Sequence, residues 1–106
     1  MRIIAEREIR FWPQGQRRSK KVLVRFGEPR SETPTDWSVT YEIIGPGPKD
    51  QVSHKAHGVD AVQALVGALQ LVPVELLAIA RAKGGKMTFL GGDELRFAPG
   101  PIDIKK

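Results

Sequence analysis

The stretch of residues 59–80, VDAVQALVGALQLVPVELLAIA, constrains the fold of this chain more than any other segment. It contains 22 residues and two charged side chains, Asp60 and Glu75. About 20 predominantly apolar residues are enough to cross a bilayer as a helix. The segment therefore either spans a membrane or packs on a protein core, and its internal pattern has to distinguish the two.

The apolar residues of this segment are spaced by three and four, the pattern of an amphipathic helix. The predicted buried stripe consists of Val62, Leu65, Val66, Leu69, Val72, Leu76, Leu77 and Ala80. The opposite, mostly polar or small side consists of Asp60, Gln63, Gly67, Gln70 and Val74. A charge such as Glu75 near the middle of a membrane helix costs about 3 kcal/mol. We therefore expect a soluble helix that lies on a core, and no membrane contact.

The segment also carries signals for the ends of this helix. Asp60 followed by Gln63 resembles a capping box, which satisfies backbone N–H groups of the first turn. Basic residues in the last turn suit the helix dipole, and Gly84–Gly85 end the helix. Pro73 lacks a backbone N–H, so we expect the helix either to kink there or to break into two helices.

Five shorter segments have the composition of strands. They are residues 3–12, 21–26, 37–44, 51–57 and 86–90, with the clearest alternation of apolar and polar residues in WSVTYEII at 37–44. We predict an α+β fold, an antiparallel β-meander of four to five strands with one long, Pro73-kinked or broken helix packed on one face. The strand residues expected beneath the helix are Val22, Val24, Val39 and Tyr41, and Ala5, Ile9 and Phe11 are expected to share a face of the first strand.

The length and composition place limits on the protein class. The chain has 106 residues, which fits a single domain, predicted at 1–98 with a C-terminal tail at 99–106. It has no cysteine, which excludes disulfides, thiol catalysis and cysteine-bound zinc. Because no secretory signal is recognisable at the N-terminus, the expected location is the cytoplasm.

The net charge of +5 is concentrated near the N-terminus. Residues 1–30 carry nine Lys or Arg against three acids, a net charge of +6. The sequence RRSKK at 17–21, close to Phe11 and Trp12, is typical of a hairpin tip that grips phosphates, or else of a solvated turn that protects edge strands from aggregation. The possible nucleic-acid contacts are Arg10, Arg17, Arg18, Lys20, Lys21 and Arg25.

Two further motifs favour ordinary structure over chemistry. GGDEL at 91–95 is similar to the signature hairpin of diguanylate cyclases, but the chain is far shorter than those domains and lacks their upstream metal-binding aspartate. We expect a tight turn there that binds no nucleotide. His54 and His57 could share a metal on a helix, but residues three apart in a strand point to opposite faces. We assign no catalytic, metal-binding or cofactor-binding residue and expect no cofactor.

Two longer pieces carry a resemblance to a known family. HGVDAVQALVGALQ at 57–70 and MTFLGGDELRF at 87–97 resemble a family of small bacterial proteins that carry a domain of unknown function. The second piece is close to a family ending of Leu-Gly-Gly-Asp-Glu-Leu-Gly-Phe-Pro, from which Arg96 and Ala98 depart. The resemblance implies a compact α+β domain of bacterial type and no catalytic residue.

The sequence supports three classes of function to different degrees. The leading hypothesis is a non-catalytic module that binds another protein. The alternative is a nucleic-acid-binding protein that uses the basic hairpin, and an enzyme is the third and least favoured class. The oligomeric state stays open.

Overall fold

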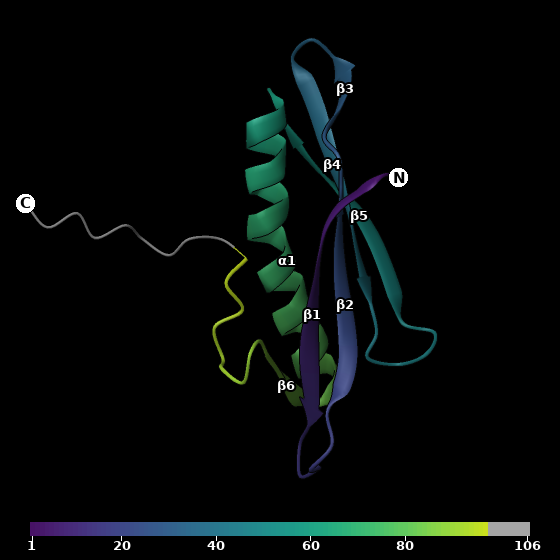
Figure 1. Cartoon of the computed structure of the whole chain (residues 1–106), viewed down its shortest axis with the longest axis vertical. Helices are drawn as coiled ribbons and strands as arrows, with labels where there is room; N and C mark the ends of the chain where they lie inside the picture. The colour runs from purple at the N-terminus through teal and green to yellow at the C-terminus, as the bar shows by residue number, and fades with distance from the viewer. Residues whose placement is uncertain (98–106) are drawn as a thin grey trace, which may run out of the picture.

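The computed structural model describes residues 1–97, so the predicted tail at 99–106 lies outside the described residues. It confirms the α+β prediction, with an antiparallel sheet covered on one face by a single helix (Figure 1). The elements are β1 (Ile3–Pro13), β2 (Lys20–Gly27), β3 (Arg30–Thr33), β4 (Asp36–Ile44), β5 (Gln51–Gly58), α1 (Ala61–Lys83) and β6 (Gly85–Thr88). The short strand β3 forms within a segment that the sequence analysis leaves without a strand.

The order of the strands explains the course of the helix. The hydrogen-bonded path is β3–β4–β2–β1–β6, and β5 also pairs with β4. Strand β4 therefore has β5 along one side, and β2 and β3 share its other side. Because β5 and β6 lie at opposite edges, α1 has to cross the sheet between them (Figure 1).

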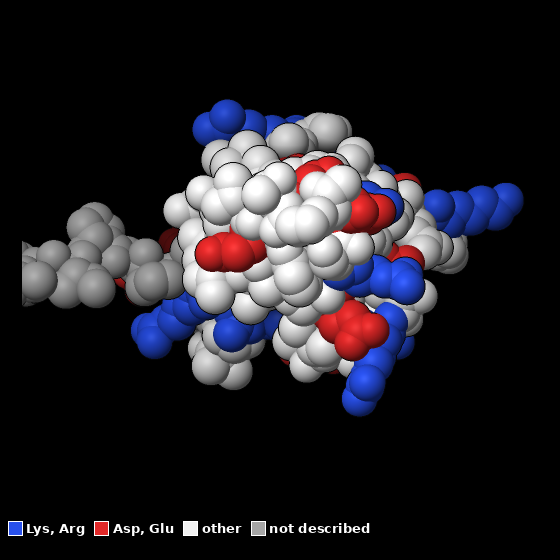
Figure 2. Space-filling view, turned by 90° about the horizontal axis from the view of Figure 1, so that it is seen from above, with Lys and Arg blue, Asp and Glu red and all other residues white. Residues whose placement is uncertain are grey.

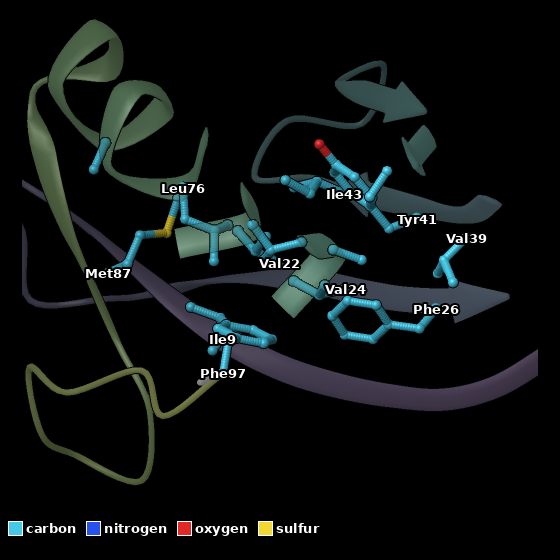
Figure 3. Packing of buried hydrophobic residues seen from close by; sticks show 14 of the residues in the cluster. Ile9, Val22, Val24, Phe26, Val39, Tyr41, Ile43, Leu76, Met87 and Phe97 are labelled. Carbon is cyan, nitrogen blue, oxygen red and sulfur yellow. The ribbon is translucent and has the colours of Figure 1, made fainter. Parts of the chain in front are cut away.

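Apolar and polar residues alternate along the strands, so the sheet has one buried face and one solvent-exposed face. The predicted inward residues of β2 and β4 are buried, and Figure 3 shows several of them meeting Leu76 of α1 and Met87 of β6. On the outer face, ion pairs such as Arg25–Glu6 at 2.9 Å cover the strands. Ile9 and Phe11 are buried, and Ala5 shares their face as predicted, because the pairing of β1 with β2 is continuous from Ala5 to Phe11. Ala5 is nevertheless exposed, at a groove that Phe26 and Leu65 also line.

Helix α1 is a single continuous helix with Pro73 inside it, and its predicted ends are confirmed. The Asp60 carboxylate accepts a hydrogen bond from the backbone N–H of Gln63 at 2.8 Å. The Gln63 side chain in turn accepts from the N–H of Val59 at 2.7 Å. Gly84 ends the helix in the left-handed conformation, at φ 67°, which favours glycine.

The prediction of the buried helical stripe was wrong in part. Val62, Val66 and Leu77 are exposed, and Leu65 and Leu69 are only partly buried. The residues that face the sheet are Ala64, Ala68, Val72, Leu76 and Ala80. They are spaced by four, and such a row is inclined to the helix axis, as suits a helix that crosses a sheet obliquely. Small residues on this row let α1 approach β5 closely.

The segment after β6 is held against β1 by Arg7. The Arg7 guanidinium lies 4.2 Å from the ring centre of Phe89 and 4.9 Å from that of Phe97. It donates hydrogen bonds to the carbonyls of Leu95 at 2.9 Å and Arg96 at 2.7 Å. Phe97 is buried and its ring lies 6.1 Å from that of Phe26, so this segment is part of the core.

Candidate functional site

The outer side of α1 carries an apolar stripe that we call the α1 seam. It comprises Val59, which precedes the N-cap of the helix, and Val62, Val66, Leu69, Pro73 and Leu77. The steps of three and four residues between them resemble the apolar positions of a coiled coil. Val62 is 69% exposed and Leu77 is 51% exposed, so both ends of the seam face solvent, whereas Leu69 and Pro73 at its centre are partly buried. Apolar residues that continue along an exposed face mark interaction surfaces more often than scattered ones do.

The length and apolar composition of α1 are also sufficient for a membrane span. The 18-residue window that meets this criterion is only 22% buried in the structure. This low value follows from the position of α1, which covers one face of the sheet and, among residues 1–97, has no second layer above it (Figure 1).

A polar cluster lies on the flank of α1 where the helix meets β4 and β5. The Glu75 carboxylate is 3.2 Å from Nε2 of His54. Burial, and then the neighbouring Glu75 carboxylate, raise the pKa of Tyr41 well above its ordinary value. The second carboxylate oxygen of Glu75 is buried without a hydrogen-bond partner. Sequence reasoning missed this cluster, because it treated Glu75 only as a charge that disfavours a membrane.

The two histidines do not come together. His57 lies 3.3 Å from the Asp36 carboxylate, on the side of β5 opposite to His54. Among residues 1–97, no group of three His, Cys, Asp or Glu side chains is arranged to hold a metal ion.

The structure separates the predicted basic residues into two groups. Arg10 donates to the hydroxyl of Ser19 at 2.9 Å and pairs with Glu8 at 3.3 Å, and Arg25 pairs with Glu6. These two arginines hold the outer face of the sheet. The remaining four are exposed and, within residues 1–97, none forms an ion pair; they are Arg17, Arg18, Lys20 and Lys21.

An open groove lies beside this basic turn, and we call it the Trp12 groove. It has a volume of about 570 Å³ and is lined by Trp12 to Gln16, Arg81 and Gly84 to Lys86. The backbone N–H of Gln14 donates to the carbonyl of Gly84 at 2.9 Å, which joins the β1–β2 turn to the end of α1. Two cations and no acid line this groove, so its field is positive.

The opposite end of the sheet has a different charge distribution. A groove there is lined by bases and acids together, including Arg2 and Arg30 with Glu28 and Glu32. Figure 2, which views the molecule from that end, shows acidic and basic side chains interspersed around an uncharged centre. The positive field of the Trp12 groove is therefore a local property of one end of the molecule.

The predicted tight turn is present, but it spans residues 89–92 and begins before GGDEL, because β6 ends at Thr88 and not at the predicted residue 90. Phe89 and Gly92 exchange two backbone hydrogen bonds of 2.9 and 3.0 Å around Leu90 and Gly91, both of which have positive φ. Asp93 is exposed and lies 3.8 Å from the Lys86 ammonium.

Comparison with known proteins identifies a family but no function. No curated protein and no solved structure matches the chain. A family model described as Domain of unknown function (DUF6968) matches residues 5–99. This range covers all strands but the first two residues of β1, and the whole of α1. The chain belongs to the family of the domain of unknown function DUF6968.

Proposed function

We propose that this protein is a non-catalytic protein-interaction module of the bacterial cytoplasm and that the α1 seam is its docking surface. The observation that carries this proposal is an apolar stripe with coiled-coil spacing that is exposed on a helix whose other side already packs on the sheet. Most of the seam lies outside the core, since a separate row of α1 supplies the buried sheet contacts and only Leu69 of the seam also packs against the core.

A protein partner suits α1 better than a lipid bilayer. Insertion into a membrane would remove Val72 and Leu76 from the core that they complete. It would also carry Glu75 away from His54 and Tyr41, at the cost of placing a carboxylate in hydrocarbon. A docked helix covers the seam and leaves the sheet contacts and the Glu75 cluster in place.

The occupant that fits the seam is a second copy of the chain. The seam is nearly symmetric about the point between Leu69 and Gln70. In an antiparallel pair of α1 helices, Val62 of one copy therefore lies opposite Leu77 of the other, and Val66 lies opposite Pro73. Such self-complementarity is the requirement of a two-fold interface. The antiparallel arrangement also places the positive end of each helix dipole beside the negative end of the other.

Pro73 gives this pair a polar contact at its centre. Because Pro73 has no N–H, the carbonyl of Leu69 lacks its usual helical donor. Gln70 is exposed and lies at the symmetry point. In the proposed dimer, the Gln70 amide of one copy donates to the Leu69 carbonyl of the other, which fixes the register of the two helices.

Sedimentation equilibrium tests the proposal. The parent chain should show a monomer–dimer equilibrium, and Val66→Lys should shift it toward monomer by at least tenfold in the dissociation constant, because a lysine ammonium would be buried in the seam. The control is Val74→Lys on the same helix, where the valine is 65% exposed but lies outside the seam. It should leave the equilibrium unchanged. A parent chain that stays monomeric at every concentration contradicts the proposal, as does equal weakening by both substitutions.

A further inference from the structure

We infer that the Trp12 groove is a binding site for single-stranded nucleic acid, with one base stacked on the Trp12 indole and the neighbouring phosphates held by Arg17, Arg18, Arg81 and Lys86. This inference is independent of the α1 seam, because none of these residues belongs to the seam. It moves the predicted basic site from the hairpin alone to a groove between the hairpin, the end of α1 and β6.

Trp12 lines the groove, and its indole is held in a fixed position. Its Nε1 donates a hydrogen bond to the hydroxyl of Thr88 at 2.9 Å. The backbone of Trp12 is also held in place, because Trp12 pairs with Lys86 in the antiparallel β1–β6 ladder. A rigid indole at the wall of an open groove is a platform on which any base can stack.

A glycine lets the end of α1 lie close to β1 at this groove. Gly84 and Gly85 line the groove where α1 turns into β6. A Cβ on Gly85 would collide with the carbonyl oxygen of Trp12 and would lie 2.6 Å from the ring of Phe11. Only glycine therefore allows the helix end to lie this close to β1, and the groove depends on that approach.

The cations around the groove come from three elements that the fold brings together. Arg81 belongs to the last turn of α1 and Lys86 to β6. Arg17 and Arg18 directly follow Gln16, which lines the groove. Three of the four have no ion pair within residues 1–97, and Lys86 has only the distant contact to the exposed Asp93 at 3.8 Å. Their side chains are therefore free to contact phosphates.

The shape of the site favours a single strand over a duplex. The bases of a duplex are stacked on one another and do not expose their faces to an indole at the wall of a groove. The end of α1 at this site is its C-terminus, whose dipole repels phosphate. The phosphates are therefore expected on the arginine and lysine side chains, and α1 is not placed to enter a major groove by its N-terminal end.

Fluorescence anisotropy with a labelled oligothymidine tests the inference in a salt series. Four phosphate contacts give an expected slope of about −3 for log K against log salt on a single strand. Arg17→Gln with Arg18→Gln should reduce the magnitude of this slope by about 1.4. Trp12→Leu should weaken binding by roughly 5- to 150-fold with the slope unchanged, and Trp12→Phe should restore most of the affinity. Arg30→Gln, an exposed arginine at the other end of the molecule, is the matched control and should have no effect.

A second measurement leaves Trp12 in place. In a Trp37→Phe background, Trp12 is the only tryptophan of the chain, and stacking of a base should quench its fluorescence in a saturable way. The inference is overturned if no oligonucleotide binds at low salt, if binding occurs without quenching, or if a duplex of the same length binds more tightly. It is also overturned if an abasic strand binds as tightly as oligothymidine, because the base would then contribute nothing.

Discussion

The two sides of α1 are made of different apolar residues. The row that faces the sheet is rich in alanine, whereas the exposed seam is made mostly of larger valines and leucines. Along about half of the length of α1, the larger apolar side chains therefore face solvent and the smaller ones face the sheet. The difference shows that the shape of the sheet, and not side-chain size alone, determines which residues of α1 are buried. Ala56 and Gly58 of β5 lie beneath the first half of α1, where only small helix residues allow close packing.

Two adjacent leucines give the largest expected difference in stability between the two sides of α1. Leu76 is fully buried and Leu77 is 51% exposed. Leu76→Ala should lower the free energy of unfolding by about 2–5 kcal/mol, because it leaves a cavity in the core. Leu77→Ala should lower it by about 0.5 kcal/mol or less in dilute, monomeric protein. Urea unfolding of the two variants measures both values, and equal losses would contradict the assignment of the two faces.

A pair of glycines tests the close approach of α1 to β5. A Cβ on Gly58 would lie 2.8 Å from the Gln63 carbonyl carbon and would collide with the backbone nitrogen of Ala64. Gly58→Ala should therefore destabilise the fold by about 1–3 kcal/mol. A Cβ on Gly67 would lie 3.6 Å from that of Ala56, an ordinary contact. Gly67→Ala should stabilise the fold by about 0.5–1 kcal/mol through helix propensity. Thermal unfolding that moves in the same direction for both would refute the packing.

These residues also show what the sequence could and could not predict. The strand alternation of β2 and β4 and both ends of α1 follow from local patterns of two residues or one turn, and they are confirmed. The buried row of α1 was predicted only in its second half, at Val72, Leu76 and Ala80. Ala64 and Ala68 were missed, because larger apolar residues nearby gave a stripe of the same helical period on a different side of the first half. The choice depends on Ala56 and Gly58, which lie beside the helix only after folding.

The Trp12 groove could not be predicted from the sequence for a related reason. Trp12 and the basic turn are neighbours in the sequence, so their association was predictable. Arg81 and Lys86 were not predictable as neighbours of Trp12, because they reach it only through the pairing of β1 with β6. No periodic pattern links positions so far apart in the chain.

The polar cluster beneath α1 offers a test of the buried side that does not remove an apolar group. Tyr41 is the single tyrosine of the chain, so its ionisation can be followed by ultraviolet absorbance. Because burial and the Glu75 carboxylate raise its pKa above 10.0, the folded chain should hold the phenolic proton at a pH where the unfolded chain releases it. The stability should therefore fall as the pH rises above about 10.

Two controls sharpen this titration. In urea, Tyr41 should ionise near its ordinary pKa of 10.0. Glu75→Gln should lower the pKa of Tyr41 in the folded chain only part of the way, because burial, the larger cause, remains. A folded chain whose tyrosine titrates near 10 would mean that α1 does not cover this part of the sheet.

The most direct test of the two-sided helix is a cross-link at the proposed symmetry point. The chain has no cysteine, so Gln70→Cys introduces a single thiol. If two α1 seams pair in antiparallel fashion, these thiols lie close to the two-fold axis, and a short bifunctional thiol reagent should convert the chain to a covalent dimer. Val74→Cys, one turn further along α1 but outside the seam, should stay monomeric under the same conditions. A Gln70→Cys chain that stays monomeric, or a Val74→Cys chain that is cross-linked equally, would contradict the account.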